Sequence, residues 1–297
     1  MASYETAGPQ PTLRATGAVA RRQAFSRVSR YVLLAATLIG VGVLFYLGFE
    51  TVQKGAGRLS WGFLTSYPSR AAERAGLRSS ILGSVWVLGV TVLSAIPIAV
   101  GTAVWIEEFA PRNRLLTLVK LNIANLAGVP SIIYGILGLA VFVRYLGLGP
   151  SILAGGLTLA LMILPMTIIA SQEAIRQVPP SIRDGSLALG ATQWQTVWRH
   201  VLPGAMPGIM TGTILAVSRA AGETAALIMI GAFTFIAFDN QSVFDDFTTV
   251  PVQIYNWTIR PQEAFRENAA GAIIVLMVAV LSLNLAAALI RERFRQD

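Results

Sequence analysis

Six separate runs of apolar residues, each long enough to cross a membrane, dominate this sequence. A helix that crosses the hydrocarbon core of a bilayer needs ~20 mostly apolar residues. Because polar segments separate the runs, we expect an all-α membrane protein with six transmembrane helices. The runs cover residues 31–49, 81–105, 115–143, 151–171, 207–233 and 269–290.

The composition fits a lipid environment and excludes several classes of function. Apolar residues make up 54% of the 297 residues and charged residues 13%, whereas soluble domains are about 25% charged. The net charge of +8 comes mainly from arginines between the apolar runs, as in cytoplasmic loops, so nucleic-acid binding is not expected. The chain has no cysteine and one histidine, His200, which excludes disulfides, thiol nucleophiles and histidine metal clusters.

The third and fifth runs are longer than one span requires and contain glycine and proline. Gly128, Val129 and Pro130 interrupt the third run. A break at membrane depth frees backbone polar groups, which must face protein or an aqueous path rather than lipid. These two runs therefore predict tilted, kinked or broken helices.

Residues 1–30 are predicted to form a polar, basic cytoplasmic tail. The charge order resembles that of a signal peptide, but the apolar core of a signal peptide has only about 7–15 residues, so we expect a retained first helix. Placing both termini in the cytoplasm puts more of the 23 lysines and arginines inside, as the positive-inside rule requires. Residues 50–80, which are also basic, would then lie outside.

Residues 236–268, on the expected outer side, are acidic and aromatic, with Asp239, Asp246 and Trp257 among them. One interpretation is that the segment covers the outer mouth of the protein or contacts a soluble partner. The other is a solvated loop with no special role.

The segment between the fourth and fifth runs predicts two short helices joined by a tight turn. Ser181 with Asp184, and Thr192 with Gln195, are capping-box patterns, which mark helix starts. Gly190 between them suits the left-handed backbone that ends a helix. The apolar side chains of this hairpin need a partner, which is either the membrane surface, the protein's own bundle or another protein.

Residues 181–203 resemble the EAA loop of ABC-transporter permeases. In that loop an acidic residue and two small residues precede a glycine and, further on, Leu-Pro. In this sequence Asp184 stands where the loop usually has Glu, and Gly185 and Ser186 stand where it has two alanines. His200 occupies a position that is usually aliphatic. The resemblance implies a coupling helix that docks into a groove of a cytoplasmic ATPase. The residues that it assigns to this coupling are Asp184, Gly185, Ser186, Leu187, Gly190, Trp194, Leu202 and Pro203.

The chain carries no nucleotide-binding loop of its own. A Walker A loop needs Gly-Lys-Ser or Gly-Lys-Thr, and the two lysines, Lys54 and Lys120, lie in other contexts. We therefore expect a transport subunit rather than an enzyme, without a cofactor, and we expect ATP and Mg to be bound by a separate ATPase subunit.

Two opposite charges, Arg219 and Glu223, lie inside the fifth run. An arginine at mid-membrane costs about 2.5–3.5 kcal/mol on the lowest scale, so such residues usually mark a pathway or form a pair. Four residues apart on one helix, the two side chains can neutralise each other as a structural ion pair. Alternatively, Arg219 presents its planar fork to an anionic substrate, with Glu223 fixing its position. Small residues at every fourth position of this run predict close packing against another helix; they are Gly204, Gly208, Gly212, Ala216 and Ala220.

The stretches at residues 219–225 and 128–135 resemble the permeases of the phosphate-specific ABC transporter. Residues 251–257, Asn284 and the short basic C-terminus are similar to its A-type permease (PstA type) rather than its C-type. The resemblance covers residues 31–297, one transmembrane permease domain of the type I-like importer fold, and leaves out the tail. Within it, Ser131 and Tyr134 are candidates for the substrate pathway beside Arg219 and Glu223. A kink stabilised by neighbouring helices is the alternative for the region of Pro130.

The resemblance implies a multi-pass protein of a bacterial or archaeal plasma membrane, embedded in lipid. Its implied partners are a second permease (PstC type), two copies of a cytoplasmic ATPase (PstB type) and an extracytoplasmic phosphate-binding protein (PstS type). The expected function is ATP-driven import of inorganic phosphate by alternating access. A permease for molybdate, sulfate or phosphonate, and a membrane scaffold for phosphate sensing without transport, are the alternatives.

Overall fold

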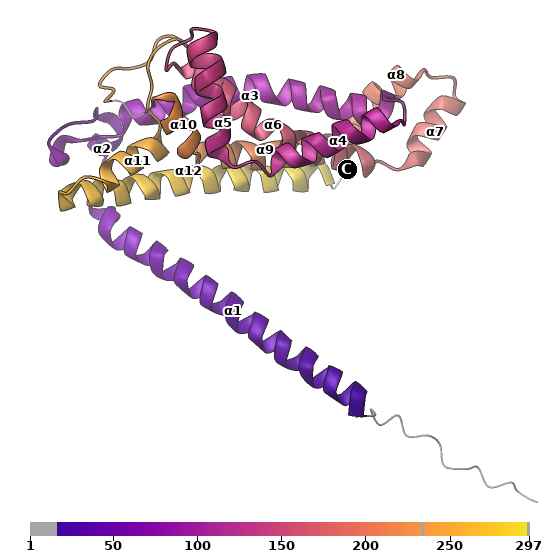
Figure 1. Cartoon of the computed structure of the whole chain (residues 1–297), viewed down its shortest axis with the longest axis horizontal. Coiled ribbons are helices and arrows are strands. Elements are labelled where there is room, and N and C mark those ends of the chain that lie inside the picture. The colour runs from indigo at the N-terminus through magenta and orange to yellow at the C-terminus, as the bar shows by residue number, and fades with distance from the viewer. Residues whose placement is uncertain (1–16, 233–234, 296–297) are drawn as a thin grey trace, which may run out of the picture. The chain divides into compact units, whose positions relative to one another are not determined.

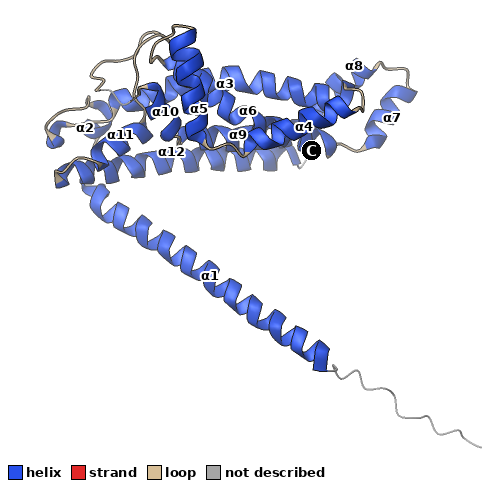
Figure 2. Cartoon of the chain, in the orientation of Figure 1, coloured by secondary structure: helices blue, strands red, loops and turns tan. Residues whose placement is uncertain are grey.

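A computed structural model describes residues 17–232 and 235–295. The described residues are helices joined by loops, with one isolated β-bridge between Ser151 and Asp246 (Figure 2). The chain divides into two units, Met1–Glu50 and Thr51–Asp297. The α-helices in chain order are α1 (Gly17–Gly55), α2 (Trp61–Thr65), α3 (Arg78–Val104), α4 (Arg114–Ala127), α5 (Ser131–Gly138), α6 (Ile152–Arg176), α7 (Pro180–Ala188), α8 (Gln193–Thr196), α9 (Leu202–Ala221), α10 (Ala225–Ile230), α11 (Val250–Thr258) and α12 (Glu263–Arg295). The short elements are the 3₁₀ turns η1 (Ala56–Arg58) and η2 (Ala72–Arg74) and the π-helical turns η3 (Trp105–Phe109), η4 (Leu139–Tyr145) and η5 (Val197–Val201).

The predicted all-helical membrane architecture is confirmed. Five described helices are long and apolar enough to span a membrane, or six if a bent pair counts as one span. That pair is α4 followed by α5 and η4, bent by 101°. The bend falls at Gly128 and Pro130, because proline disfavours helical backbone in the residue before it. The break predicted in the third run is therefore present.

The first helix begins before its apolar run. α1 starts at Gly17, so residues 17–30 of the predicted tail are helical and continue the first span. Residues 1–16 of that tail lie outside the described residues.

In the second unit, α6 is the most enclosed of the candidate spans. In its most apolar stretch 67% of the residues are buried, compared with 28% in α3 with η3 and 11% in α12. α3 and α9 pack directly against α6, and α12 packs against α9 (Figure 1). The large apolar side chains that remain exposed on α3 and α12 face outward, as side chains facing lipid do.

The predicted stripe of small residues brings α9 against α6. A Cβ atom built on Gly208 would lie 2.6 Å from Cβ of Ala174, and one on Gly212 would lie 2.4 Å from Cβ of Ala170. Real Cβ atoms do not approach so closely, so the two backbones meet at a distance that only glycine allows. The prediction of close helix packing is confirmed.

We expect Gly212→Val to destabilise the protein, because its side chain would force α9 away from Ala170. Overpacking of this kind costs about 1–3 kcal/mol. Gly101→Val is the matched control, since Gly101 also lies inside a helix but has open space around it. Thermal unfolding of the two variants in the same detergent measures the difference, and equal midpoints would contradict the expectation.

Candidate functional site

The predicted helical hairpin is present, and its first helix starts two residues earlier than the sequence pattern indicates. α7 begins at Pro180, Pro179 occupies the cap position, and no side chain caps the helix start. The predicted capping box of Ser181 and Asp184 is therefore wrong. The reason is that proline in the first turn has no N–H to satisfy and already holds helical backbone geometry.

The second helix of the hairpin starts as predicted. Thr192 and Gln195 form a complete capping box at the start of α8. Gly190 has a φ of +85°, the left-handed conformation expected after the end of α7. The hydroxyls of Ser186 and Thr196 are 2.9 Å apart, and this buried contact holds α7 against α8.

The residues assigned to coupling fall into two groups. Ser186 faces the interior of the hairpin, and Leu202 and Pro203 lie at the start of α9. The others are exposed on the hairpin; they are Asp184, Gly185, Leu187, Gly190 and Trp194. Leu189 is 91% exposed and Trp194 59%, so the hairpin presents an apolar surface that the described residues leave uncovered.

Arg183 attaches the hairpin to the bundle. Its guanidinium donates to Glu108 at 2.7 Å and to the carbonyl oxygens of Val178 at 2.7 Å and Ile175 at 2.9 Å. The side chain of Glu108 is 9% exposed and that of Arg183 23%, and Gln193 donates to the backbone carbonyl of Glu108. The hairpin is thus fixed to both η3 and the end of α6.

Sequence analysis missed this attachment. Arg183 and Glu108 are 75 residues apart, and nothing local in the sequence indicates that they meet. One signal in the sequence was the acidic pair Glu107 and Glu108 at the end of a long apolar run. Carboxylates are rarely buried without a cationic partner, so this pair indicated that a basic residue lies nearby in the fold.

The hairpin continues directly into the fifth span. α8, η5 and α9 form one uninterrupted helix, Gln193–Ala221. The π-helical turn η5 precedes Pro203, where the missing N–H and the proline ring would otherwise break the helix. The helix Gln193–Ala221 therefore forms one continuous rod. The exposed hairpin lies at its start, and Arg219 lies near its end.

The rod ends at the charged pair predicted in the fifth run. α9 stops at Ala221 with Gly222 as its cap, and α10 begins at Ala225. Glu223 lies in the break, where its carboxylate accepts from the backbone N–H of Ala226 at 3.3 Å. Arg219 and Glu223 are thus not on one helix face, and the expected ion pair is absent among the described residues.

Arg219 is exposed and has weak partners. Its Nη1 lies 3.8 Å from Sδ of Met166, and its charge interacts electrostatically with the hydroxyl of Tyr134. Within the described part of the chain, Arg219 forms no ion pair. Next to it, Ser218 and Asn284 are joined by a hydrogen bond of 2.8 Å that ties α9 to α12.

The breaks in the third and fifth spans lie side by side. A Cβ atom on Gly135 of α5 would lie 2.8 Å from Cα of Ala226 in α10, so the two half-helices are in direct contact. Tyr134 is buried, and its hydroxyl donates to the carbonyl of Leu126 across the first break at 2.8 Å. Ser131 is half-buried at the start of α5. Ser131 and Glu223 thus lie at the two breaks, Tyr134 bridges the first break, and Arg219 lies at the end of α9 before the second.

The acidic and aromatic segment, residues 236–268, is partly helical and partly buried rather than a fully solvated loop. It includes α11 and the first turn of α12, and Trp257 is buried with its ring centroid 5.8 Å from that of Phe63. Asp239 binds Arg78 at the start of α3, with Nε 2.8 Å from Oδ1. The hydrogen bond from Arg78 lowers the pKa of the Asp239 carboxyl below its ordinary value. The segment is therefore anchored at the N-terminal ends of α3 and α6.

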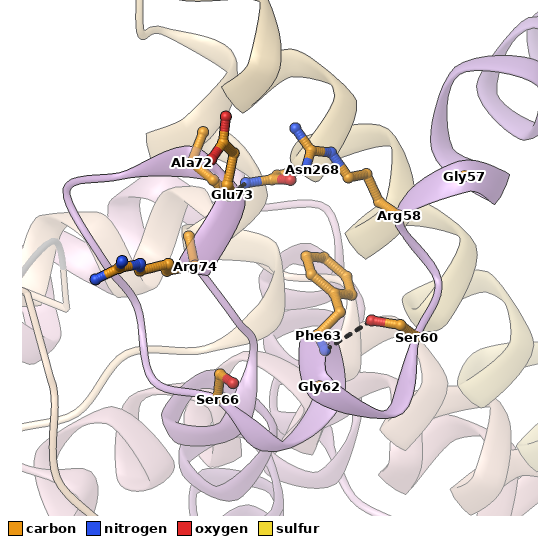
Figure 3. A pocket seen from close by; sticks show the side chains of 11 residues that line it. Gly57, Arg58, Ser60, Gly62, Phe63, Ser66, Ala72, Glu73, Arg74 and Asn268 are labelled. Atoms are coloured by element: carbon orange, nitrogen blue, oxygen red, sulfur yellow. Dashed lines mark hydrogen bonds between the residues drawn. The ribbon is translucent and has the colours of Figure 1, made fainter.

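A polar pocket of about 220 Å³ opens near this end (Figure 3). In Figure 3 Arg58, Glu73 and Asn268 lie on one side of it. The amide of Asn268 donates to the carbonyl of Ala72 at 2.8 Å, and Arg58 pairs with Glu267 at 3.2 Å. These contacts join the segment after α1 to the first turns of α12. Among the described residues no group of three His, Asp or Glu side chains is placed to hold a metal ion.

Comparison with known proteins places this arrangement among membrane transporters. The sequence profile of the family described as binding-protein-dependent transport system inner membrane component matches residues 20–296. A probable ABC transporter permease protein of Bacillus subtilis, YqgI, is 34% identical over 86% of this chain and 89% of its own length. The phosphate transport system permease protein PstA 1 of Mycobacterium tuberculosis is 34% identical over 73% of this chain and 70% of its own. PstA of Xylella fastidiosa is 26% identical over 90% of this chain and 92% of its own.

Solved structures share the fold. A chain of the MetNI methionine ABC transporter in an inward-facing conformation superposes with a TM-score of 0.58, covering 71% of this chain and 94% of that chain at 18% identity. A chain of a bacterial alginate ABC transporter in complex with a pentasaccharide-bound periplasmic protein superposes with a TM-score of 0.60, covering 89% and 95% at 18% identity.

Proposed function

Since this chain belongs to the family of binding-protein-dependent transport system inner membrane components, we propose that it is the permease subunit of an ATP-driven importer of inorganic phosphate. The observation that carries the proposal is the continuous helix Gln193–Ala221. It joins an exposed apolar hairpin to an arginine without an ion-pair partner among the described residues. Relatives named as phosphate transport permeases support phosphate as the anion.

In the proposed mechanism the hairpin receives the motion of a cytoplasmic ATPase. Leu187, Leu189 and Trp194 supply apolar surface for a groove on that partner. The bonds of Arg183 to Glu108 and to the end of α6 make the hairpin move together with the bundle rather than swing alone. Closure of the ATPase then displaces the rod and with it Arg219.

At the other end of the rod, Arg219 meets the substrate. Its guanidinium presents parallel N–H donors that match the oxygens of a tetrahedral anion. Because it has no carboxylate partner among the described residues, phosphate does not have to displace one. Ser131 supplies a second hydroxyl donor at the adjacent break, whereas Tyr134 already donates to Leu126 and positions the break instead.

The proposed complex contains a second permease (PstC type), two ATPase subunits (PstB type) that bind ATP and Mg, and an extracytoplasmic phosphate-binding protein (PstS type). Both termini of this chain lie in the cytoplasm in the proposed orientation. The exposed apolar hairpin then faces the ATPase, and the segment from Asp239 to Trp257 faces the binding protein.

Reconstitution of the purified complex in vesicles tests the proposal. We expect phosphate uptake that requires ATP and the binding protein, and ATP hydrolysis that rises with phosphate. Molybdate, sulfate and phosphonate are the competitors. Strong competition by one of them, with weak phosphate uptake, would assign the permease to that anion. Normal phosphate import after deletion of the chain, with altered gene regulation, would assign it a sensing role.

A further inference from the structure

A basic pocket lies between the end of α3, the start of α4 and the end of α6. Figure 1 shows the start of α4 at the end of the bundle near α7 and α8. Its walls are formed by η3, the loop that follows it, the first turns of α4 and the last turn of α6. Its volume is about 660 Å³, which is large enough for a phosphate group together with attached atoms.

The pocket contains more positive charge than the described residues neutralise. Arg112, Arg114, Lys120 and Arg176 line it together with one carboxylate, Glu107. Glu107 is shared between Lys120 at 2.9 Å and Arg176 at 2.8 Å. Arg176 has a second partner in Glu173 on its own helix at 2.8 Å.

Arg112 and Arg114 are the unmatched charges. Both are exposed, and neither forms an ion pair in the part of the chain that the structure describes. They follow directly after a candidate span and lie beside an existing network of charges. Such a pair of guanidinium groups offers several N–H donors to one anion.

An apolar surface continues from the pocket along α4. On this helix Leu118 and Leu121 follow Arg114 by four and seven residues, so they share its face, and they are 56% and 55% exposed. Trp105, at the start of η3, is 51% exposed, and tryptophan is enriched at the level of lipid headgroups. The pocket thus has exposed apolar side chains beside it, on the Arg114 face of α4 and at Trp105.

We propose that this pocket binds a phosphate group. Two arginines without ion-pair partners among the described residues, and a lysine at its wall, match the charge and geometry of phosphate oxygens. Basic pockets between transmembrane helices bind anionic headgroups in this way. The adjoining leucines indicate a phospholipid headgroup as the source, and free inorganic phosphate has the same chemistry. The proposal does not depend on which anion the protein transports.

The test uses the full-length chain in detergent, stripped of lipid. Native mass spectrometry measures binding of phosphatidylglycerol, and equilibrium dialysis measures binding of inorganic phosphate. We expect the wild type to bind phosphatidylglycerol about tenfold more tightly than the variant Arg112→Gln/Arg114→Gln, a difference appropriate to the loss of two charge-assisted contacts. A tenfold difference with inorganic phosphate alone would identify free phosphate as the ligand.

The matched control is Arg70→Gln/Arg74→Gln, which removes the same charge from exposed arginines outside the pocket. It is expected to bind both probes as the wild type does. Equal binding of both probes by the wild type and by the Arg112→Gln/Arg114→Gln variant would overturn the proposal. So would an equal loss of binding in the control.

Discussion

Phosphate uptake by the assembled transporter is expected to fall at least about tenfold when Arg219 is replaced by glutamine, the loss expected for a charged contact made during transport. Glutamine keeps much of the length of arginine but removes the cation. Folding should be unaffected, because Arg219 is exposed and its recorded contacts are a thioether at 3.8 Å and an electrostatic interaction with Tyr134. The measurement is ATP-dependent uptake in vesicles at matched protein content.

Two comparisons make this result specific. Arg219→Lys keeps the charge without the planar fork, so partial uptake is expected from it. Glu223→Gln should have a smaller effect, since the oxygen that accepts from Ala226 is kept and no ion pair with Arg219 is lost. Wild-type uptake by Arg219→Gln, with normal expression, would remove Arg219 from the mechanism.

Arg183→Gln is expected to separate ATP hydrolysis from transport. The substitution removes the bonds to Glu108 and to two backbone carbonyls and leaves a carboxylate that is 9% exposed without its partner. Breaking a well-buried pair costs about 3–5 kcal/mol, and the partial exposure of Arg183 reduces that cost. Uptake should fall about tenfold, while ATP hydrolysis by the complex persists without stimulation by the substrate-loaded binding protein.

Arg199→Gln is the control for this loss. Arg199 is exposed on η5, in the same part of the chain. We expect it to retain coupled uptake. If Arg183→Gln transports phosphate and hydrolyses ATP with the wild-type ratio, the hairpin does not need its attachment to Glu108.

The sequence contained enough to predict the spans and the places where they break. The length of the apolar runs predicted the transmembrane helices. Pro130 marked the break in the third span, because proline restricts the backbone of the residue before it. The small residues at Gly208 and Gly212 indicated close packing, although not which helix they would meet. Local chemistry of this kind can be read from neighbouring residues alone.

Other features depended on competition between local signals or on distant contacts. Ser181 has the pattern of a helix cap, but Pro180 starts α7 first. Arg219 and Glu223 have the spacing of an ion pair, but Gly222 ends the helix between them. The partner of Arg183 lies 75 residues away, and no sequence rule connects a hairpin arginine to one particular carboxylate at that separation.

The glycine contact between α9 and α6 lies near the middle of the helix Gln193–Ala221. With a rise of about 1.5 Å per residue, the two arms on either side of Gly208 are each about 20 Å long. The glycine contact at its centre and the bond of Arg183 at the hairpin both hold this helix to α6. We therefore expect α9 and α6 to tilt as one unit, with the hairpin and Arg219 moving in opposite directions. A tilt of about 10° would displace each end of such an arm by roughly 3–4 Å, more than the reach of one hydrogen bond.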